Sequence, residues 1–246
     1  MATVVVRADA PIPGSVLPRL VEGTPLTEGD VADLYRSALQ DVCEAVAGSG
    51  GDLLVNYRER EDRDEDVEEV LRDVVPTALA DPEAARFEVQ VGSTPGARIG
   101  NTVTHLLESE GESSVAMLDP TAVLAPRPRL DQASMQLRRN EVVVGPAVNG
   151  EVFYAGFTEP IDFSDVGTRL GIETTVERAT DAGLSVSTLE MAPTLRTPAQ
   201  LRSALPILRA RRDGGLPVPE RTVACLDALG LRTVETADGE NSIERA

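Results

Sequence analysis

The sequence predicts an α/β protein of three layers, in which helices cover both faces of a mainly parallel sheet. Three observations support this prediction. Short apolar runs, typical of buried strands, alternate along the chain with longer segments of helical period. The length of 246 residues suits one such domain, with residues to spare for a helical addition. Apolar residues make up 41% of the chain, which is enough for a sizeable core.

The first strand is predicted over Thr3 to Val6, a short apolar run. The segment 7–20 follows it and is rich in Pro and Gly, so we expect a defined loop there rather than a helix. In open α/β sheets, ligands bind where a first strand leads into such a loop. This loop, which contains Arg19, is therefore the first candidate for a binding site.

The first long helix is predicted to begin after Thr27. Thr27 is a candidate N-cap, and Asp30 three residues later completes a box-like pattern. Apolar residues then recur at helical spacing until Gly48. The same reasoning predicts strands over 52–57, 86–91, 114–118, 141–144, 152–157 and 186–191, and helices over 99–107, 130–138, 172–182, 201–212 and 221–229.

Two segments carry little apolar surface. Residues 58–73 are dense in charge, which favours a solvated loop leading into a helix over a cluster of metal-binding carboxylates. The tail from Thr236 is polar, and we expect it to be frayed. The last two predicted helices, in contrast, carry apolar residues that either cover the sheet or form a contact in a homodimer. These residues are Leu201, Leu205, Leu208, Val223, Leu226 and Leu229.

The charge of the chain excludes several functions. The formal net charge is −18, and all 23 basic residues are arginines. Without lysine, the chain has neither Schiff-base chemistry nor a Walker-type phosphate loop. An acidic surface argues against non-specific binding of nucleic acid, which requires a basic face. Because salt screens the self-repulsion of such a charge, the composition suggests a halophilic protein.

No run of about 18 apolar residues is present, so no membrane span is expected. The N-terminal residues do not combine a basic region with a long apolar stretch, so we expect a cytoplasmic protein without a signal peptide. Cys43 and Cys225 lie in different predicted helices and are expected to be free thiols. His105, the single histidine, is expected to be a partly buried structural residue, because no catalytic Ser-His-Asp or Cys-His pattern surrounds it.

Asp119 is the first candidate for chemistry. It follows the apolar strand predicted over 114–118, and a carboxylate at the carboxyl end of a parallel strand faces the ligand crevice. The alternative is an aspartate that starts a turn or caps a helix.

Three further polar sites each have two interpretations. Asn149-Gly150 is a strong turn signal between two apolar strands, and a binding role is compatible with that turn. Arg196 either pairs with a diphosphate by bidentate hydrogen bonds or is an exposed residue before a helix. Arg98 either helps to bind an anion at a helix N-terminus or faces the solvent.

Several of these segments resemble, in the same order along residues 3–205, the motifs of a glycosyltransferase-like family associated with arsenosugar biosynthesis. The residues shared with that family are Ala10, Pro11, Pro13, Gly14, Val16, Arg19, Leu20, Gly100, Asp119, Gly145, Pro146, Ala147, Gly150, Gly156, Thr197, Pro198 and Leu201.

The resemblance implies a GT-A fold of the nucleotide-diphosphosugar transferase type over residues 1–205. Residues 206–246 would then be a helical extension and polar tail packed on the same domain. The donor would be a UDP-, GDP- or dTDP-linked sugar. Asp119 would hold Mg²⁺ or Mn²⁺, which stabilises the charge of the leaving diphosphate. The residues implied to bind the donor are Pro13, Gly14, Arg19, Asn149 and Gly150.

The chain departs from the family pattern at charged positions. Asp9 and Leu17 replace two lysines, Asn149 replaces an aspartate, and Arg196 reverses the charge of another. Losing phosphate clamps or metal ligands weakens the stabilisation of a transition state, so no catalytic residue is assigned. Three hypotheses follow. The first is a glycosyltransferase-like protein that binds a nucleotide sugar, with weakened or altered activity. The second is a catalytically inactive binding or partner protein on the same fold. The third is a nucleotidylyltransferase in which Arg19 substitutes for the missing lysine.

Overall fold

The valines of the first strand alternate between the two faces of the sheet, and both faces are covered. In the computed structural model, β1 (Ala2–Ala8) places Val4 and Val6 in one apolar cluster and Val5 in a second one. Burial on both faces explains why the strand reads as a continuous apolar run. The structure describes residues 2–59, 65–164, 166, 170–235 and 241–245.

Seven strands form one mixed sheet in the order β3-β2-β1-β4-β6-β5-β7. The strand β6 runs antiparallel to both of its neighbours, and the other pairings are parallel. The mainly parallel sheet that the sequence predicts is therefore confirmed. The strands after β1 are β2 (Asp52–Tyr57), β3 (Ala85–Val89), β4 (Ser114–Leu118), β5 (Val142–Pro146), β6 (Val152–Phe157) and β7 (Val186–Thr188).

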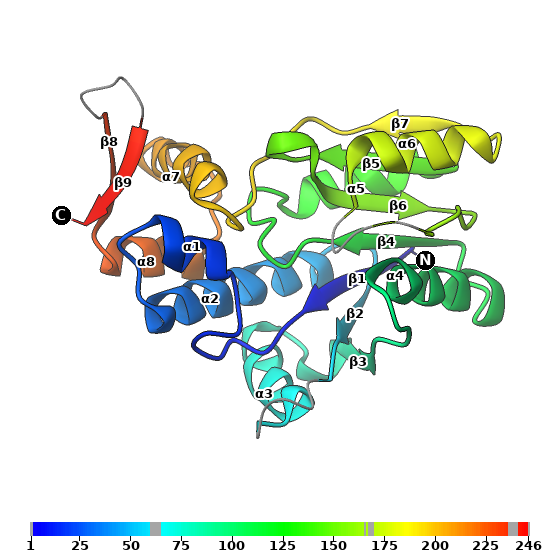
Figure 1. Cartoon of the computed structure of the whole chain (residues 1–246). Helices are drawn as coiled ribbons and strands as arrows, with labels where there is room; N and C mark the ends of the chain where they lie inside the picture. The colour runs from blue at the N-terminus through cyan, green and yellow to red at the C-terminus, as the bar shows by residue number, and fades with distance from the viewer. Residues whose placement is uncertain (1, 60–64, 165, 167–169, 236–240, 246) are drawn as a thin grey trace.

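Helices cover the two faces of this sheet and complete the three layers (Figure 1). The face of Val4 and Val6 packs against α2 (Glu28–Ala47), α3 (Val67–Val74) and α5 (Arg127–Gln136). The face of Val5 packs against α4 (Pro95–Thr104) and α6 (Ile172–Asp181). None of the helices in the described part of the chain has the length and hydropathy to span a membrane.

The chain ends in two helices, α7 (Pro198–Asp213) and α8 (Glu220–Ala228), and α8 lies beside α2 (Figure 1). The sequence left two roles open for the apolar residues of these helices, a place in the core or a contact in a dimer. In the structure they lie against the core of this chain. Five of them are buried, and Leu229 packs against them partly buried. The helix α7 runs across the expected boundary between residues 205 and 206.

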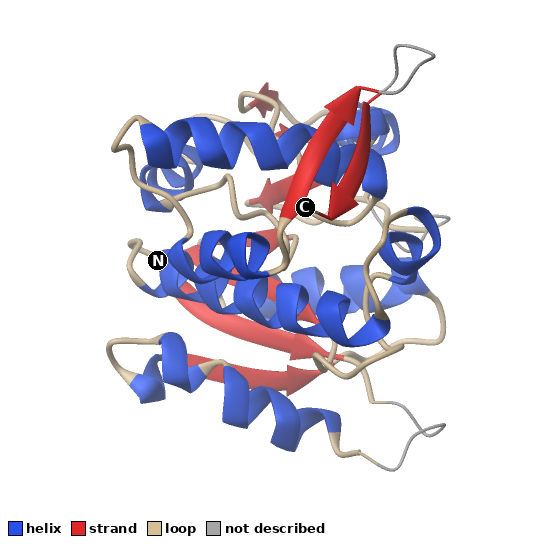
Figure 2. Cartoon of the chain, turned by 90° about the vertical axis from the view of Figure 1, so that its left-hand side faces the viewer, coloured by secondary structure: helices blue, strands red, loops and turns tan. Residues whose placement is uncertain are grey.

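The expectation of a frayed tail is wrong for the last described residues. The strands β8 (Leu231–Glu235) and β9 (Asn241–Arg245) form an antiparallel hairpin, which stands apart from the main sheet (Figure 2). The side chain of Ile243 is buried and anchors the hairpin to the core. The first residues of the predicted tail, 236–240, lie outside the described residues.

Helix α4 begins earlier than predicted, at Pro95, because the hydroxyl of Thr94 accepts a hydrogen bond from Ala97 N at 3.1 Å. The chain continues from α4 into a π-helical turn, His105–Ser109. This turn exposes His105, whose Nε2 lies 3.2 Å from a carboxylate oxygen of Glu110. The expectation of a partly buried histidine is therefore wrong.

The expectation of a loop rather than a helix over 7–20 is wrong for its last residues. A short helix, α1 (Pro18–Gly23), begins inside the predicted loop and continues past its end. Residues 60–64 of the charged segment lie outside the described residues, and the segment ends in α3, which Asp66 caps by accepting from Glu68 N and Glu69 N. Both cysteines are free thiols, as expected, and burial raises the pKa of Cys43.

Candidate functional site

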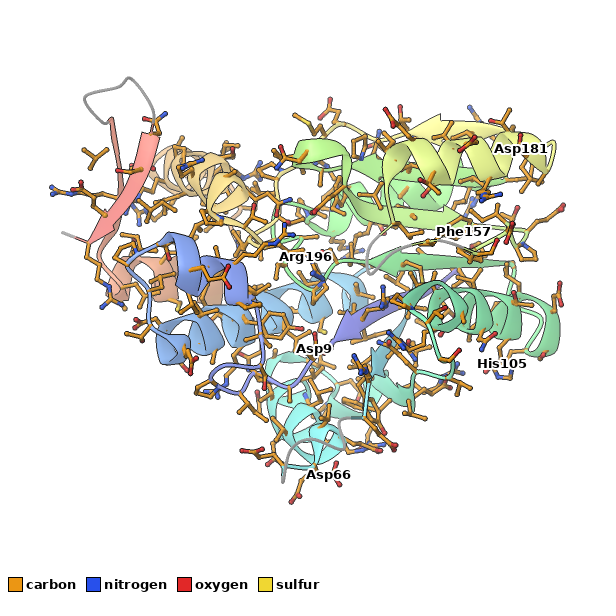
Figure 3. The ribbon with its side chains drawn as sticks, viewed as in Figure 1. Asp9, Asp66, His105, Phe157, Asp181 and Arg196 are labelled. Carbon is orange, nitrogen blue, oxygen red and sulfur yellow. The ribbon has the colours of Figure 1, made fainter. Side chains whose placement is uncertain are left out.

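The strands β1 and β4 are parallel neighbours, so their carboxyl ends meet at one edge of the sheet. Arg7 lies near the end of β1, and Asp119 comes directly after β4. In Figure 3, Arg196 and Asp9 both lie next to the end of β1. Side chains from these places surround a cavity of about 50 Å³, which we call the crevice pocket. It is lined by Arg7, Met117, Leu118, Asp119, Pro120, Val152, Phe153, Leu170 and Arg196.

The volume of the crevice pocket leaves room for a few water-sized groups, on the scale of one phosphate. It is far below the roughly 300–1,000 Å³ of a site that encloses a drug-sized ligand. Larger cavities of about 510, 600 and 610 Å³ lie elsewhere, on other elements of the fold. Within the crevice, therefore, only the small charged end of a ligand fits this conformation.

Asp119 is held in place by hydrogen bonds on its backbone and its side chain. Its N–H donates to Phe153 O at 2.9 Å. Its Oδ1 accepts from Thr121 N at 2.8 Å and from Thr121 Oγ1 at 2.6 Å. The interpretation of Asp119 as the start of a turn is thus confirmed, and the same carboxylate also lines the pocket.

The second oxygen of Asp119 pairs with an arginine that is distant in the sequence. Arg196 Nε donates to Asp119 Oδ2, and the two side chains are 24% and 9% exposed. Burial opposes the charge of Arg196, but the Asp119 carboxylate more than compensates and raises the pKa of Arg196. Arg196 is therefore neither a simple exposed residue nor remote from the crevice.

Residues at the start of α7 fix Arg196. Gln200, which is fully buried, accepts from Arg196 N at 3.2 Å and from Thr194 Oγ1 at 2.6 Å. The adjacent Leu195 N donates to Thr121 Oγ1 at 3.3 Å, which links this segment to the turn of Asp119. The backbone that leads into Arg196 is thus tied both to the start of α7 and to the turn of Asp119.

Four charged residues act on Arg7 from nearby. Burial, and then the charge of Arg196, lower the pKa of Arg7 to about 10, so Arg7 stays charged at neutral pH. Arg98 also repels Arg7, while Asp9 and Asp119 attract it. Arg98 Nη1 donates to Gly92 O at 3.2 Å, which holds this arginine at the start of α4.

Tyr35 of α2 supports the end of β1. Its hydroxyl accepts a hydrogen bond from Asp9 N at 2.9 Å, and burial raises the pKa of the phenol. The neutral phenol of Tyr35 thus fixes the backbone at Asp9, where the chain leaves β1.

Mg²⁺ and Mn²⁺ prefer oxygen ligands, and a carboxylate that holds them needs an oxygen turned toward the cation and no competing positive charge beside it. Thr121 and Arg196 occupy the two oxygens of Asp119. No group of three or more His, Cys, Asp and Glu side chains among the described residues could hold a metal ion. The assignment of Asp119 as a metal ligand stays a prediction, and the chemistry of its neighbours does not fit it.

Of the six residues that the resemblance assigned to metal or donor binding, Asp119 alone lines the crevice pocket. Arg196, for which the sequence left a diphosphate contact open, lines it as well. Pro13 and Gly14 are exposed in the first loop, and Arg19 is exposed in the first turn of α1. Their binding roles stay predictions.

Asn149 and Gly150 form an exposed turn between β5 and β6. Both have positive φ angles, 65° and 72°, which Asn and Gly adopt most readily. The turn closes with a hydrogen bond of 2.7 Å from Ala147 N to Glu151 O. The turn interpretation of this dipeptide is confirmed, and its role in donor binding stays a prediction.

Arg7 was not among the candidates from the sequence, although its position in the first strand indicates a role at the site. It is a charged residue near the end of an otherwise apolar strand, where a side chain must either pair or face a ligand.

Comparison with known proteins gives the class of fold. The chain superimposes with a TM-score of 0.73 on a protein from Desulfovibrio desulfuricans G20 named "putative nucleotide-diphospho-sugar transferase", at 21% identity over 92% of this chain and 94% of that one. A cytidylyltransferase from Leptospira borgpetersenii gives a TM-score of 0.52 at 10% identity over 92% and 94% of the two chains. A 4-diphosphocytidyl-2C-methyl-D-erythritol synthase from Anaerococcus prevotii gives 0.52 at 12% identity over 85% and 96%. No family model and no curated protein matches the sequence.

The protein therefore has the fold of nucleotide-diphospho-sugar transferase-like proteins. Identities of this size show the fold alone, and function must be argued from the site.

Proposed function

We propose that this protein is a glycosyltransferase-like protein that binds a nucleotide-diphosphosugar, with its diphosphate at the crevice pocket. The observation that carries the proposal is the placement of Arg7 and Arg196 beside Asp119, where β1 and β4 end. In open α/β sheets this edge is the place where ligands bind. Guanidinium groups suit phosphate oxygens because their N–H donors match them in pairs.

The size of the pocket defines how such a donor would lie. A phosphate fits between the arginines, whereas the nucleoside and the sugar must extend along the adjoining surface. Pro13, Gly14 and Arg19 of the first loop, with Asn149 and Gly150 of the exposed turn, are the residues we propose to meet those parts. The arsenosugar association belongs to the sequence resemblance, and we keep it as part of this proposal.

Calorimetry with UDP-, GDP- and dTDP-linked sugars, in concentrated KCl and with or without Mg²⁺ or Mn²⁺, tests the proposal. We expect one of them to bind and thereby to name the donor class. Arg19→Ala should weaken that binding by about 1.5–3 kcal/mol, the value of a hydrogen bond to a charged group. Unchanged binding by Arg19→Ala would remove Arg19 from the site, and no binding of any donor by the folded protein would contradict the proposal.

A second candidate is a catalytically inactive binding or partner protein on the same fold. The pairing of both Asp119 oxygens with Thr121 and Arg196 favours it, because the positive charge of Arg196 beside the carboxylate opposes a metal cation there. Donor binding without turnover would support this candidate. Release of pyrophosphate from a nucleoside triphosphate would instead identify a nucleotidylyltransferase.

A further inference from the structure

A guanidinium stands beside Asp119, at the position where the resemblance to glycosyltransferases calls for a divalent cation. We propose that Arg196, anchored on Asp119, takes the place of that cation, and that Arg196 and Arg7 together hold a diphosphate without metal. This inference rests on the proposed function for the identity of the ligand, but the anion site itself can be tested without a nucleotide.

Asp119 is arranged to hold a guanidinium. Thr121 donates two hydrogen bonds to Oδ1 and fixes the carboxylate, which leaves Oδ2 to face Arg196. The contact uses Nε, and a guanidinium carries four further N–H donors in the same plane. Because Arg196 lines the crevice pocket, this plane can present donors to an anion while Nε stays on Asp119.

The position of Arg196 is set by the fold. Gln200 holds the backbone N–H of Arg196, and its own Nε2 donates to Glu151 Oε2 at 3.0 Å. Thr197 caps α7 by accepting from Gln200 N at 3.3 Å. A cation fixed in this way needs little reorganisation when an anion arrives, and such preorganisation increases affinity.

The charges around the crevice favour an anion. The guanidiniums of Arg196 and Arg98 both act on that of Arg7, against the carboxylates of Asp9 and Asp119. On a chain of net charge −18, this is a local excess of positive charge. Arg7 and Arg196 repel each other across a largely buried space, and a bound phosphate relieves that repulsion.

Titration with inorganic pyrophosphate tests the anion site directly. We expect the wild-type protein to bind pyrophosphate in EDTA as well as it does with Mg²⁺. Arg196→Gln should weaken that binding by about tenfold or more, the loss expected for a charged hydrogen bond. Arg138→Gln, at an exposed arginine outside the pocket, is the matched control and should bind as the wild type does.

Two outcomes of this titration overturn the inference. One is binding that appears only with Mg²⁺ or Mn²⁺, and the other is no binding of pyrophosphate under either condition. If pyrophosphate binds in EDTA but no nucleotide sugar binds, the proposed function fails while the metal-free anion site stands.

A charge reversal at Arg196 gives a second, independent readout. Glutamate places a carboxylate oxygen as many bonds from Cα as the Nε of arginine, so Arg196→Glu should set two carboxylates against each other. We expect its melting temperature to fall in EDTA and to recover when Mn²⁺ is added. The wild type and Arg138→Glu, which has the same change of charge, should not respond to Mn²⁺.

An equal or greater response of the wild type to Mn²⁺ would overturn the inference, because it would show that Asp119 already binds the cation. If Arg196→Glu does not fold, the comparison of wild type with Arg196→Gln in the pyrophosphate titration decides the question.

Discussion

Two glycines that the resemblance singled out, Gly145 and Gly156, lie where packing leaves no space for a Cβ atom. A Cβ on Gly145 would lie 2.6–2.9 Å from ring atoms of Phe153, and one on Gly156 would lie 2.7 Å from Leu137 Cδ1. Phe153 in turn lines the crevice pocket and accepts the hydrogen bond from Asp119 N. The absence of a side chain at 145 therefore lets Phe153 sit where it supports the site.

We expect Gly145→Ala to lower the free energy of unfolding by about 1–3 kcal/mol, because the ring of Phe153 must shift in a packed core. In a chain of this length that corresponds to a fall in melting temperature of roughly 2–4 °C per kcal/mol, measurable by calorimetry. Gly29→Ala is the control, since its Cβ would meet only Thr27 Oγ1 at 3.8 Å and helix α2 favours alanine there. Equal stability of Gly145→Ala and the wild type would show that Phe153 has room to move.

At the scale of single residues, the sequence singled out both Asp119 and Arg196 as candidates but did not predict that they pair with each other. Asp119 was found because strand ends are local features. Arg196 reaches it across 77 positions of the chain, and no local pattern records which arginine pairs with which carboxylate. Pro13, Gly14 and Arg19 show the converse, because their segment matches a motif while all three residues are exposed and outside the crevice pocket.

Among the elements, α8 depends on another helix for its cap. Pro219 precedes α8 and provides no side-chain cap. Asp41 of α2 accepts instead from Thr222 N and Thr222 Oγ1, both at 2.7 Å, and from Arg221 Nη1 at 3.2 Å. The carboxylate of Asp41 is thus a buried polar link between the C-terminal extension and the layer of α2.

We expect Asp41→Asn to lower the free energy of unfolding by about 2–3 kcal/mol, because hydrogen bonds to a buried charge are lost and Arg221 keeps its own charge. Chemical denaturation measures this directly. Asp33→Asn, an exposed change on the same helix, should cost less than about 0.5 kcal/mol. If the two variants have the same stability, α8 does not depend on the Asp41 carboxylate.

The N-terminus of α2 gives a prediction for pH. Asp30 accepts from Thr27 Oγ1 at 2.6 Å and from Thr27 N at 2.8 Å, and these bonds lower the pKa of Asp30 below its usual 3.8. The carboxylate therefore contributes its full stability above pH 3.8, and this contribution is lost as the pH falls through the lowered pKa.

At neutral pH, Asp30→Asn should cost about 0.5–2 kcal/mol, as for other helix caps. The difference in melting temperature between the variant and the wild type should shrink below the usual pKa of aspartate. A difference that stays constant down to the acid transition would contradict a role of the Asp30 charge.

Most elements could be predicted because strands buried on both faces and amphipathic helices leave strong periodic signals. The sequence did not predict the hairpin of β8 and β9, because its strands are short and largely polar. A single buried residue, Ile243, fixes β9. The sequence did not predict helix α1, because Pro18 indicates a loop, although proline is favoured in the first turn of a helix.

For the molecule as a whole, the net charge of −18 predicts a dependence on salt. At low ionic strength the carboxylates repel one another across the surface, and salt shortens the range of that repulsion to about 3 Å at molar concentration. We expect the melting temperature to rise steadily from low to molar KCl. Greatest stability at low salt would contradict both this prediction and the hypothesis of a halophilic origin.

A homodimer, which the sequence left open as one of two alternatives, is also a property of the whole molecule. The apolar residues of α7 and α8 that suggested it lie against the core of the same chain, so an interface would need other residues. Sedimentation in concentrated KCl distinguishes a monomer from a dimer.

The pairing of Asp119 with Arg196 also orders events in time. The two residues are 77 positions apart, and a ribosome adds roughly 5–20 residues per second, so about 4–15 s separate their synthesis. During that interval the nascent chain holds Arg7 and the Asp119 carboxylate but not the guanidinium that neutralises it. The crevice is thus completed late in translation, and a product that ends before residue 196 lacks the arginine that pairs with Asp119.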